Sequence, residues 1–338
     1  MSNEHLIVVG NGPAGNQAAL TLEECLPDAR VTIISKESHS FYKPRLLPDF
    51  IAGKIKKDAV CGSSLKAYCP SKVKLRCGQE VVSVDFKQRE LTLDHREKLS
   101  FTGLIIAVGG KPRIPEPLLA FENFFLTLKT LNDAKRWRDK LAQAERILIM
   151  GGDLTSLAIT KALIHMKKDV LFMLNEDALW PLRCNPSILD EVAGHLAGKG
   201  VHVLKSTKVK GMQPLAAQGF QVAIDDKTIE VDLIGAFFGL IPNIQFLSQS
   251  GLKIDRGILV DEYLNAGFEG VYATGDCAQI YHPDISDYWV SIGHNNAVNL
   301  GRVAALNLAG GRVRADRTKE SIFDVQGIKV NTSWWTEF

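Results

Sequence analysis

Three glycines near the start of the chain have the spacing needed to hold a pyrophosphate. They follow the apolar segment Leu6 to Val9, read Gly10-x-Gly12-x-x-Gly15, and lead into AGNQAALTLEE. The pattern predicts a strand, a tight turn at Gly10 and a helix, with Gly12 letting the backbone approach the phosphates and Gly15 letting helix and strand pack closely. The phosphates would lie at the positive end of that helix.

A carboxylate follows where ribose hydroxyls would need an acceptor. The stretch ARVTIISKE reads as a second strand and ends at Glu37, about 22 residues past Gly15. A lone glycine pattern is weak, but strand, loop, helix, strand and acid together predict a dinucleotide site over residues 6–37.

A second loop of this kind is incomplete. RILIMGGDLTSLAIT, residues 146–160, has Gly151 and Gly152, but Asp153 and Ser156 stand where the other two glycines are expected. A carboxylate at about 4 Å from a phosphate charge, at an effective dielectric constant of about 20, is repelled by about 4 kcal/mol. Alternatively, Asp153 is a helix N-cap and the nucleotide binds in a shifted position. Three alternatives stay open, namely ordinary, altered or lost binding of a dinucleotide.

Composition limits the class of protein. The 338 residues suffice for two or three domains, and 46% hydrophobic and 23% charged residues are typical of a soluble globular protein. A net charge of +2 gives no reason to expect nucleic acid as a partner, and no apolar run is long enough to span a membrane. Because MSNEHLIVVG does not read as a signal peptide, we expect a cytoplasmic protein.

The six cysteines include no C-x-x-C pair, and we expect no metal site. Cys61, Cys69 and Cys77 are regularly spaced, but we interpret them as ordinary free thiols of a reducing compartment.

Further segments resemble one family. LIIAVGGKPRIP (104–115), GVYATGDCAQI (270–280) and NNAVNLGRVAALNLAGG (295–311) resemble the FAD-dependent pyridine nucleotide–disulfide oxidoreductase superfamily. The resemblance implies an α/β fold with two Rossmann-like domains, the second inserted into the first, and a truncated C-terminal domain. It implies an FAD-binding domain over 1–115 and 250–318, an NAD(P)-binding-like domain over 116–249, and a short tail over 319–338.

The same resemblance implies which residues contact FAD. The expected set is Gly10, Gly12, Pro13, Ala14, Gly15, Glu37, Lys43, Arg45, Val81, Ala107, Gly109, Gly275, Asp276, Asn296 and Ala297. The helix that follows His294 would direct its N-terminus at the flavin and stabilise negative charge there.

Residues 40–55, SFYKPRLLPDFIAGKI, look most like NAD(P)H:rubredoxin reductases and the flavin portion of nitrite reductase large subunits. By that likeness Lys43 and Arg45 would lie near the flavin or the FAD phosphates and, with His294, form the catalytic set; capping or a surface position is the alternative for His294. The segment Ser40 to Arg45 has no cysteine, so we expect FAD to be the only redox centre of the chain.

The resemblance implies that the second loop binds NAD(P)H, but further departures around this loop make NAD(P)H a doubtful ligand. Ala158 replaces a glutamate near the nicotinamide pocket, and Leu174 stands where a ribose-binding acid is usual, although Glu176 could substitute. At the end of the chain, Trp334, Trp335 and Phe338 would pack on the protein itself or on a partner.

The resemblance implies an FAD-dependent oxidoreductase that passes electrons from NAD(P)H through flavin to a small redox protein of the rubredoxin, iron–sulfur or haem kind. One alternative is an FAD-containing electron-transfer subunit of a larger complex, with a degenerate nicotinamide site. A second alternative is a non-enzymatic FAD-binding scaffold. A protein redox partner is expected, and a homo-oligomer or a complex is possible.

Overall fold

The chain forms two compact units. The computed structural model describes residues 4–61, 72–174, 186–205, 207–290, 293–315, 322–325 and 328–331. Unit 1 comprises Met1–Lys43, Lys57–Lys111 and Ile241–Thr318, and unit 2 comprises Pro44–Lys56, Pro112–Leu240 and Lys319–Phe338. The boundaries at 111/112 and 240/241 fall in the short strands β8 (Gly110–Pro112) and β17 (Leu240–Pro242). Most of unit 2 is thus inserted into unit 1.

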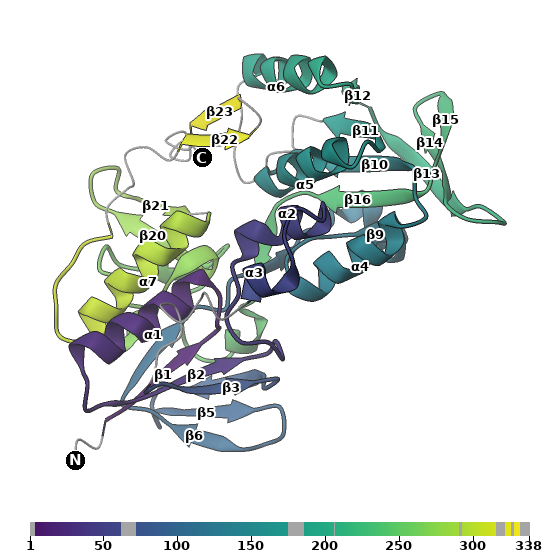
Figure 1. Ribbon diagram of the computed structural model, residues 1–338. Coiled ribbons are helices and arrows are strands. Elements are labelled where there is room, and N and C mark those ends of the chain that lie inside the picture. Colours follow the sequence, from purple (N-terminus) through teal and green to yellow (C-terminus); the bar gives the residue numbers. More distant parts are fainter. Residues whose placement is uncertain are drawn as a thin grey trace. The chain divides into compact units, whose positions relative to one another are not determined.

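Unit 1 is built on a parallel sheet with the strand order β19-β7-β1-β2-β3. Its strands are β1 (His5–Val9), β2 (Arg30–Ser35), β3 (Lys74–Cys77), β7 (Gly103–Ile106) and β19 (Val271–Ala273). All five residues of the central strand β1 are buried, as expected for a strand covered on both faces. Helices α1 (Pro13–Cys25) and α7 (His294–Leu308) lie side by side along this sheet (Figure 1).

Two small sheets and short helical segments complete unit 1. The order β4-β5-β6 is antiparallel, and β20 pairs with β18 in parallel and with β21 antiparallel. The bounds are β4 (Val81–Asp85), β5 (Glu90–Leu93), β6 (Lys98–Ser100), β18 (Ile258–Val260), β20 (Ala278–His282), β21 (Asp287–Val290), α3 (Lys57–Cys61), η4 (Gln245–Leu247) and η5 (Gly275–Cys277).

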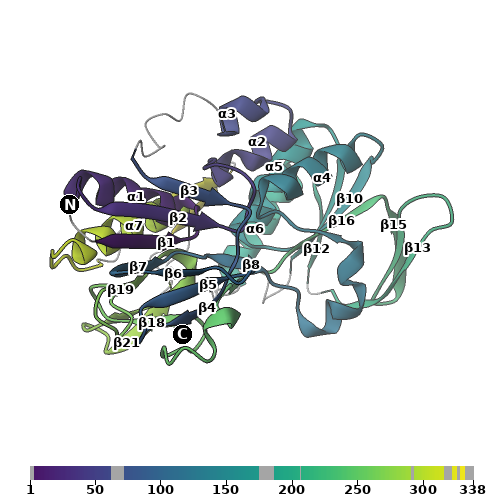
Figure 2. The same cartoon turned by 90° about the horizontal axis from the view of Figure 1, so that it is seen from below.

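Unit 2 repeats the parallel plan, with the strand order β12-β11-β10-β16-β9. An antiparallel sheet, β13-β14-β15, extends beyond the parallel sheet of this unit (Figure 2). The strands are β9 (Phe125–Leu126), β10 (Arg146–Gly151), β11 (Asp169–Leu174), β12 (His202–Lys205), β13 (Val209–Pro214), β14 (Phe220–Ile224), β15 (Lys227–Val231), β16 (Leu233–Phe237), β22 (Ile322–Val325) and β23 (Ile328–Asn331). The helices are η1 (Pro44–Leu46), α2 (Leu47–Ile51), η3 (Glu116–Phe124), α4 (Leu131–Leu141), α5 (Leu154–His165) and α6 (Pro186–Gly198).

Helix α2 explains why residues 44–56 belong to unit 2, whereas the sequence analysis assigned them to the FAD-binding domain. Leu47, Phe50 and Ile51 are buried on one side of this helix, which packs against α4 and α5. The guanidinium of Arg138 on α4 lies 4.6 Å from the centroid of the Phe50 ring. Helix α5 is apolar on most of its surface, and it packs against α2 on one side and against the sheet on another.

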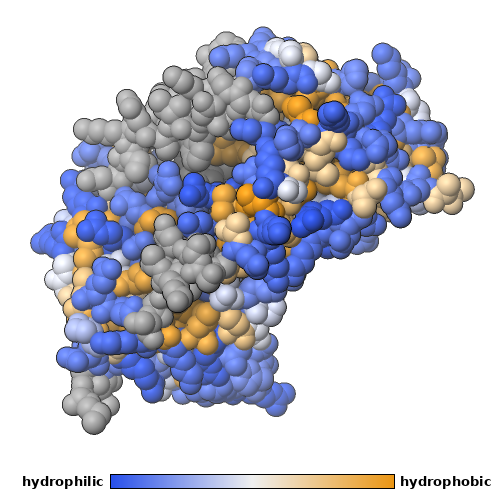
Figure 3. Space-filling view, in the orientation of Figure 1, coloured by the Kyte–Doolittle hydropathy of each residue, from blue (hydrophilic) through white to orange (hydrophobic). Residues whose placement is uncertain are grey.

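Each unit has its own apolar core. In unit 1 the core joins the parallel sheet to α1 and α7, and in unit 2 Trp137 is fully buried and stacks on Phe237. Large exposed hydrophobic side chains such as Leu75 on β3 and Leu119 in η3 come from different elements, and Figure 3 shows hydrophobic residues interspersed with hydrophilic ones. Two parallel sheets flanked by helices confirm the predicted α/β class.

Candidate functional site

The first glycine loop connects β1 to α1 and is too tight for side chains at two positions. Gly10 has a φ of +107°, and a Cβ there would lie 2.2 Å from the carbonyl oxygen of Ala107 at the end of β7. A Cβ on Gly15 would lie 1.9 Å from the carbonyl oxygen of Gly10 and 3.3 Å from the Cβ of Ala107. Both glycines are therefore required by packing within the protein.

Gly12 is different, because the space beside it is open. It is the N-cap of α1 at φ −77°, it provides no side-chain cap, and a Cβ there would have no atom of the described chain within 4 Å. The first turn of α1 therefore keeps its backbone N–H groups uncovered by any side chain of the N-cap. A space of this kind at a helix N-terminus suits a phosphate.

Buried polar atoms border the same loop. Asn11 Oδ1 and Thr274 Oγ1 are both buried, and neither has a hydrogen-bond partner in the described part of the chain. Asn11 lies between the first two glycines, and Thr274 directly precedes η5, with its N–H donating to the Ile106 carbonyl at 2.9 Å. The Thr274 hydroxyl could donate to a phosphate oxygen, and Asn11 Oδ1 could accept from a hydroxyl, so these unsatisfied atoms fit a polar ligand such as FAD, which has a pyrophosphate and a ribityl chain.

Helices α1 and α7 meet at the same place. A Cβ on Gly301 of α7 would lie 2.1 Å from the carbonyl oxygen of Ala14, so the two helices touch backbone to backbone. Gly275 has a φ of +74°, and its Cβ would lie 3.0 Å from the Cβ of Ala14 and 4.0 Å from that of Ala297. The structure thus brings Ala14, Gly275 and Ala297, three of the predicted contacts, into one cluster.

The remaining predicted contacts of unit 1 lie around this cluster or at the end of β2. Asp276 is half-buried in η5, and Asn296 is buried in the first turn of α7. Gly109 has a φ of +59°, and its carbonyl accepts the Asn243 N–H at 2.9 Å. Pro13 is the first residue of α1, and Val81 is buried in the core at the start of β4. Their roles toward FAD stay predictions.

Glu37 lies just beyond β2, as expected for a ribose acceptor. Its two carboxylate oxygens accept from the Tyr42 hydroxyl at 3.2 and 2.9 Å, and its backbone carbonyl accepts the Gly78 N–H at 3.0 Å. Burial and the Glu37 charge raise the pKa of Cys77, so this thiol stays protonated at neutral pH.

The three residues predicted to be catalytic belong to different segments. Lys43 is half-buried at the end of a unit 1 segment, and its N–H donates to the Val60 carbonyl at 3.1 Å. Arg45 is exposed in η1, which belongs to unit 2. His294 is half-buried at the first position of α7, after Gly293 with a φ of +111°. Lys43 and His294 are therefore parts of unit 1, and Arg45 is not.

Sequence reasoning passed over Asn11, Thr274, Tyr42 and Gly301 as parts of this region. Gly301 did carry a signal, because a glycine inside a helix costs about 1 kcal/mol relative to alanine and so indicates a close contact.

Burial raises the pKa of Cys277, next to Asp276, to about 11, so this thiol is protonated at neutral pH. Among the described residues, no group of three or more His, Cys, Asp or Glu side chains is arranged so that it could hold a metal ion.

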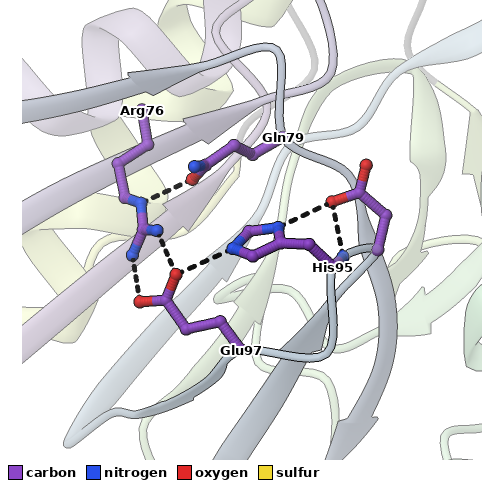
Figure 4. Close-up of polar contacts among 5 residues, drawn as sticks. Arg76, Gln79, His95 and Glu97 are labelled. Carbon is purple, nitrogen blue, oxygen red and sulfur yellow. Dashed lines mark hydrogen bonds and ion pairs between the residues drawn. The ribbon is translucent and has the colours of Figure 1, made fainter.

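A second polar cluster, on the surface of unit 1, connects β3 to the turn between β5 and β6. Arg76 donates to Gln79 and to both carboxylate oxygens of Glu97, and His95 lies between Glu97 and Asp94 (Figure 4). Hydrogen bonds from Arg76 and His95 lower the pKa of Glu97 to about 2, and those to Glu97 and Asp94 raise the pKa of His95. These groups satisfy one another, so the cluster fastens the hairpin to β3.

The second loop, between β10 and α5, has the same tight turn as the first. Gly151 has a φ of +106°, and a Cβ there would lie 1.8 Å from the carbonyl oxygen of Phe237 at the end of β16. Asp153 is the N-cap of α5, and its Oδ1 accepts the Ser156 N–H at 2.8 Å. Its Oδ2 accepts the Gly239 N–H at 3.1 Å. The capping role considered from the sequence is therefore the one that the structure shows.

The other departures around the second loop are placed only in part. Ala158 is half-buried on α5, and Leu174 is buried at the end of β11. Glu176, Cys69 and the tail residues Trp334, Trp335 and Phe338 lie outside the described residues.

Two Rossmann-like units, the first with an open dinucleotide loop that suits FAD, define a flavoprotein oxidoreductase of the two-dinucleotide-fold class. The chain belongs to the pyridine nucleotide-disulphide oxidoreductase family, whose model matches residues 4–299. This confirms the predicted family, FAD as the cofactor and oxidoreductase as the type of enzyme. No helix in the described part of the chain is long and apolar enough to cross a membrane.

The sequence identity with individual relatives is low. A putidaredoxin reductase of Pseudomonas putida is 27% identical over 319 residues, which are 91% of this chain and 75% of the relative. A rubredoxin-NAD(+) reductase of Ectopseudomonas oleovorans is 23% identical over 333 residues, 96% of this chain and 84% of the relative. The solved structure of an NAD-dependent persulfide reductase from A. fulgidus has a TM-score of 0.85 at 24% identity, over 95% of this chain but only 62% of that one, and supports the fold alone.

Proposed function

We propose that the chain passes electrons from NAD(P)H through FAD to a small redox protein of the rubredoxin, iron–sulfur or haem kind. Support comes from the names of its relatives, which are reductases of putidaredoxin and rubredoxin. The observation that carries the flavin part is the open space at Gly12, beside the buried, unpartnered Asn11 Oδ1 and Thr274 Oγ1. Bound FAD supplies the redox chemistry, because it exchanges electrons both in pairs and singly.

The chain's own residues would bind and orient the cofactor. Gly12 and the N–H groups of α1 would hold the phosphates, and Glu37 would accept from ribose hydroxyls. The N-terminus of α7, with His294 and Asn296, would stabilise negative charge near the flavin. Lys43 would supply a positive charge, and the role of Arg45, which lies in η1, stays a prediction.

We assign FAD to unit 1 and the NAD(P)-binding-like role to unit 2. The predicted boundaries, 1–115 with 250–318 and 116–249, differ from those of the units in residues 44–56, 112–115 and 241–249. The first of these segments contains α2, which packs on α4 and α5. The assignment is supported by the contrast between Gly12, with open space beside it, and Asp153, whose carboxylate occupies the corresponding place.

A protein redox partner follows from the same relatives, and a homo-oligomer or a larger complex stays a prediction. We also propose a cytoplasmic location. Its support is that Cys25, Cys77 and Cys277 are free thiols, as is usual in a reducing compartment.

The test separates the two halves of the reaction. The FAD-loaded protein is reduced anaerobically with one equivalent of dithionite and then mixed with oxidised rubredoxin, a [2Fe–2S] ferredoxin or a b-type cytochrome. Reoxidation of the flavin matched by reduction of one acceptor within seconds is expected. A fully reduced flavin that none of the three acceptors reoxidises would refute the proposed acceptor class. In parallel, bleaching near 450 nm by NADH or NADPH tests the donor.

A further inference from the structure

The chain contains the same strand–loop–helix twice, which allows an internal comparison. In unit 1 the turn at Gly10 packs against the Ala107 carbonyl at the end of β7, and in unit 2 the turn at Gly151 packs against the Phe237 carbonyl at the end of β16. Both turns have nearly the same φ, +107° and +106°. The backbone that brings a dinucleotide to a helix N-terminus is therefore built in both units.

The two loops differ two residues after that turn. Gly12 provides no side-chain cap, whereas Asp153 places a carboxylate on the N-terminus of α5. One carboxyl oxygen accepts the Ser156 N–H at 2.8 Å, and the other accepts the Gly239 N–H at 3.1 Å. The Thr155 N–H also donates to this carboxyl group. Donors that a pyrophosphate would need at this helix are thus bound by a carboxyl group belonging to the chain itself, and burial raises the pKa of this group.

Gly239 makes this arrangement more than an ordinary helix cap. It follows β16, has a φ of +82°, and its carbonyl accepts the Arg113 N–H at 2.9 Å. The Asp153 carboxylate therefore ties the start of α5 to the turn after β16, across the carboxyl edge of the sheet where dinucleotides bind in this fold.

Ser156 adds a second obstacle. Its counterpart Gly15 has no room for a Cβ, because that atom would lie 1.9 Å from the Gly10 carbonyl oxygen. In unit 2 the Cβ is present, and the Ser156 hydroxyl donates to the Asp153 carbonyl at 2.6 Å. Helix α5 therefore cannot approach its loop as closely as α1 approaches the first one.

The residues of the second loop, as they stand, do not fit the pyrophosphate of NAD(P)H. We propose that the Asp153 carboxylate is a built-in occupant of the anion-binding end of α5 and that it sets the affinity of unit 2 for pyridine dinucleotides. A dinucleotide binds there only when this carboxylate leaves the N–H groups of Ser156 and Gly239. The proposal rests on the proposed function only in naming NAD(P)H as the ligand.

The test measures binding without any redox reaction. NAD⁺, NADP⁺ and ADP-ribose are titrated calorimetrically into the FAD-loaded wild type, Asp153→Gly and Asp153→Asn. We expect a dissociation constant of about 1 mM or weaker for the wild type and at least a tenfold decrease in Asp153→Gly, which corresponds to about 1.4 kcal/mol. Asp153→Asn keeps a carbonyl acceptor at the same place, so a smaller decrease than in Asp153→Gly is expected, and this variant carries the test if the glycine variant does not fold.

Asp232→Asn is the matched control. This carboxylate also accepts two backbone N–H groups, from Glu145 at 2.7 Å and Arg146 at 2.8 Å, but at the opposite end of β10. Its loss should lower the melting temperature and leave dinucleotide affinity unchanged.

A micromolar dissociation constant in the wild type would overturn the proposal. So would unchanged affinity in folded Asp153 variants, or an equal gain in Asp232→Asn. If the Asp153 variants bind NAD⁺ more tightly but NADH still does not bleach the flavin, this proposal stands and the nicotinamide donor of the proposed function fails.

Discussion

Replacing Gly12 by alanine should separate FAD binding from folding. The residue has a φ of −77° and a ψ of −173°, which alanine adopts without strain, and its new methyl would meet no atom of the described chain within 4 Å. As an N-cap, alanine is poorer than glycine by about 1 kcal/mol or less, a small part of a typical stability of about 5–15 kcal/mol. Folding should therefore be nearly unaffected.

The same methyl should weaken FAD binding, because it fills the space through which the backbone would approach the pyrophosphate. Overpacking by one methyl typically costs about 1–3 kcal/mol, which corresponds to roughly a 5- to 150-fold increase in the dissociation constant. The assay is titration of the apoprotein with FAD, followed by quenching of flavin fluorescence, together with thermal unfolding of the apoprotein.

The control is Gly194→Ala on α6, which is exposed and whose new Cβ would also meet nothing within 4 Å. It should raise helix stability by about 0.5–1 kcal/mol and leave FAD affinity unchanged. The reasoning is refuted if Gly12→Ala binds FAD as tightly as the wild type, or if its apoprotein is unfolded.

Three other predictions concern unit 1. Gly301→Ala should destabilise the protein by at least about 1–3 kcal/mol, because its Cβ would lie 2.1 Å from a carbonyl oxygen of α1; an unchanged midpoint in urea unfolding would contradict this. His95→Gln should lower stability at pH 5.5 but not at pH 9, because the flanking carboxylates raise the pKa of His95. The stabilisation by His95 is complete below the unfolded pKa of 6.5 and disappears as the pH rises through the folded pKa. Equal losses of stability at both pH values would argue against this prediction. Cys277, buried and with a pKa of about 11, should resist iodoacetamide at pH 8 until the protein unfolds, while exposed Cys25 reacts at once. Mass spectrometry of the labelled peptides measures the order of labelling, and the reverse order would contradict this prediction.

The first loop could be predicted from sequence because its determinants are local. Gly10, Gly12 and Gly15 lie within one strand–turn–helix, and the structure shows why Gly10 and Gly15 accept no side chain. The role of Asp153 could not be decided in this way. Aspartate is both a good N-cap and a poor neighbour for phosphate, and the choice depends on Gly239, which lies 86 positions further along the chain.

The place of α2 was also beyond the sequence. Leu47, Phe50 and Ile51 form a stripe that any short amphipathic helix could have, and nothing in the stripe specifies which sheet or helix covers it. The family resemblance implied a first domain over residues 1–115, and this range includes the segment. Burial against α4 and α5 is a long-range contact, and such contacts are not encoded in local periodicity.

The position of α2 in the chain has a consequence for synthesis on the ribosome. Helix α2 ends at Ile51 and α5, against which it packs, ends at His165, about 110 residues later. At roughly 5–20 residues per second, about 6–22 s pass between the synthesis of the apolar stripe on α2 and the synthesis of the helix against which it packs. The sheet of unit 1 takes longer to complete, because β19 and the covering helix α7 follow the whole of the inserted stretch 112–240 in the chain. The parallel sheet of unit 2 is therefore complete before that of unit 1, although strands β1 and β2 of unit 1 are made first.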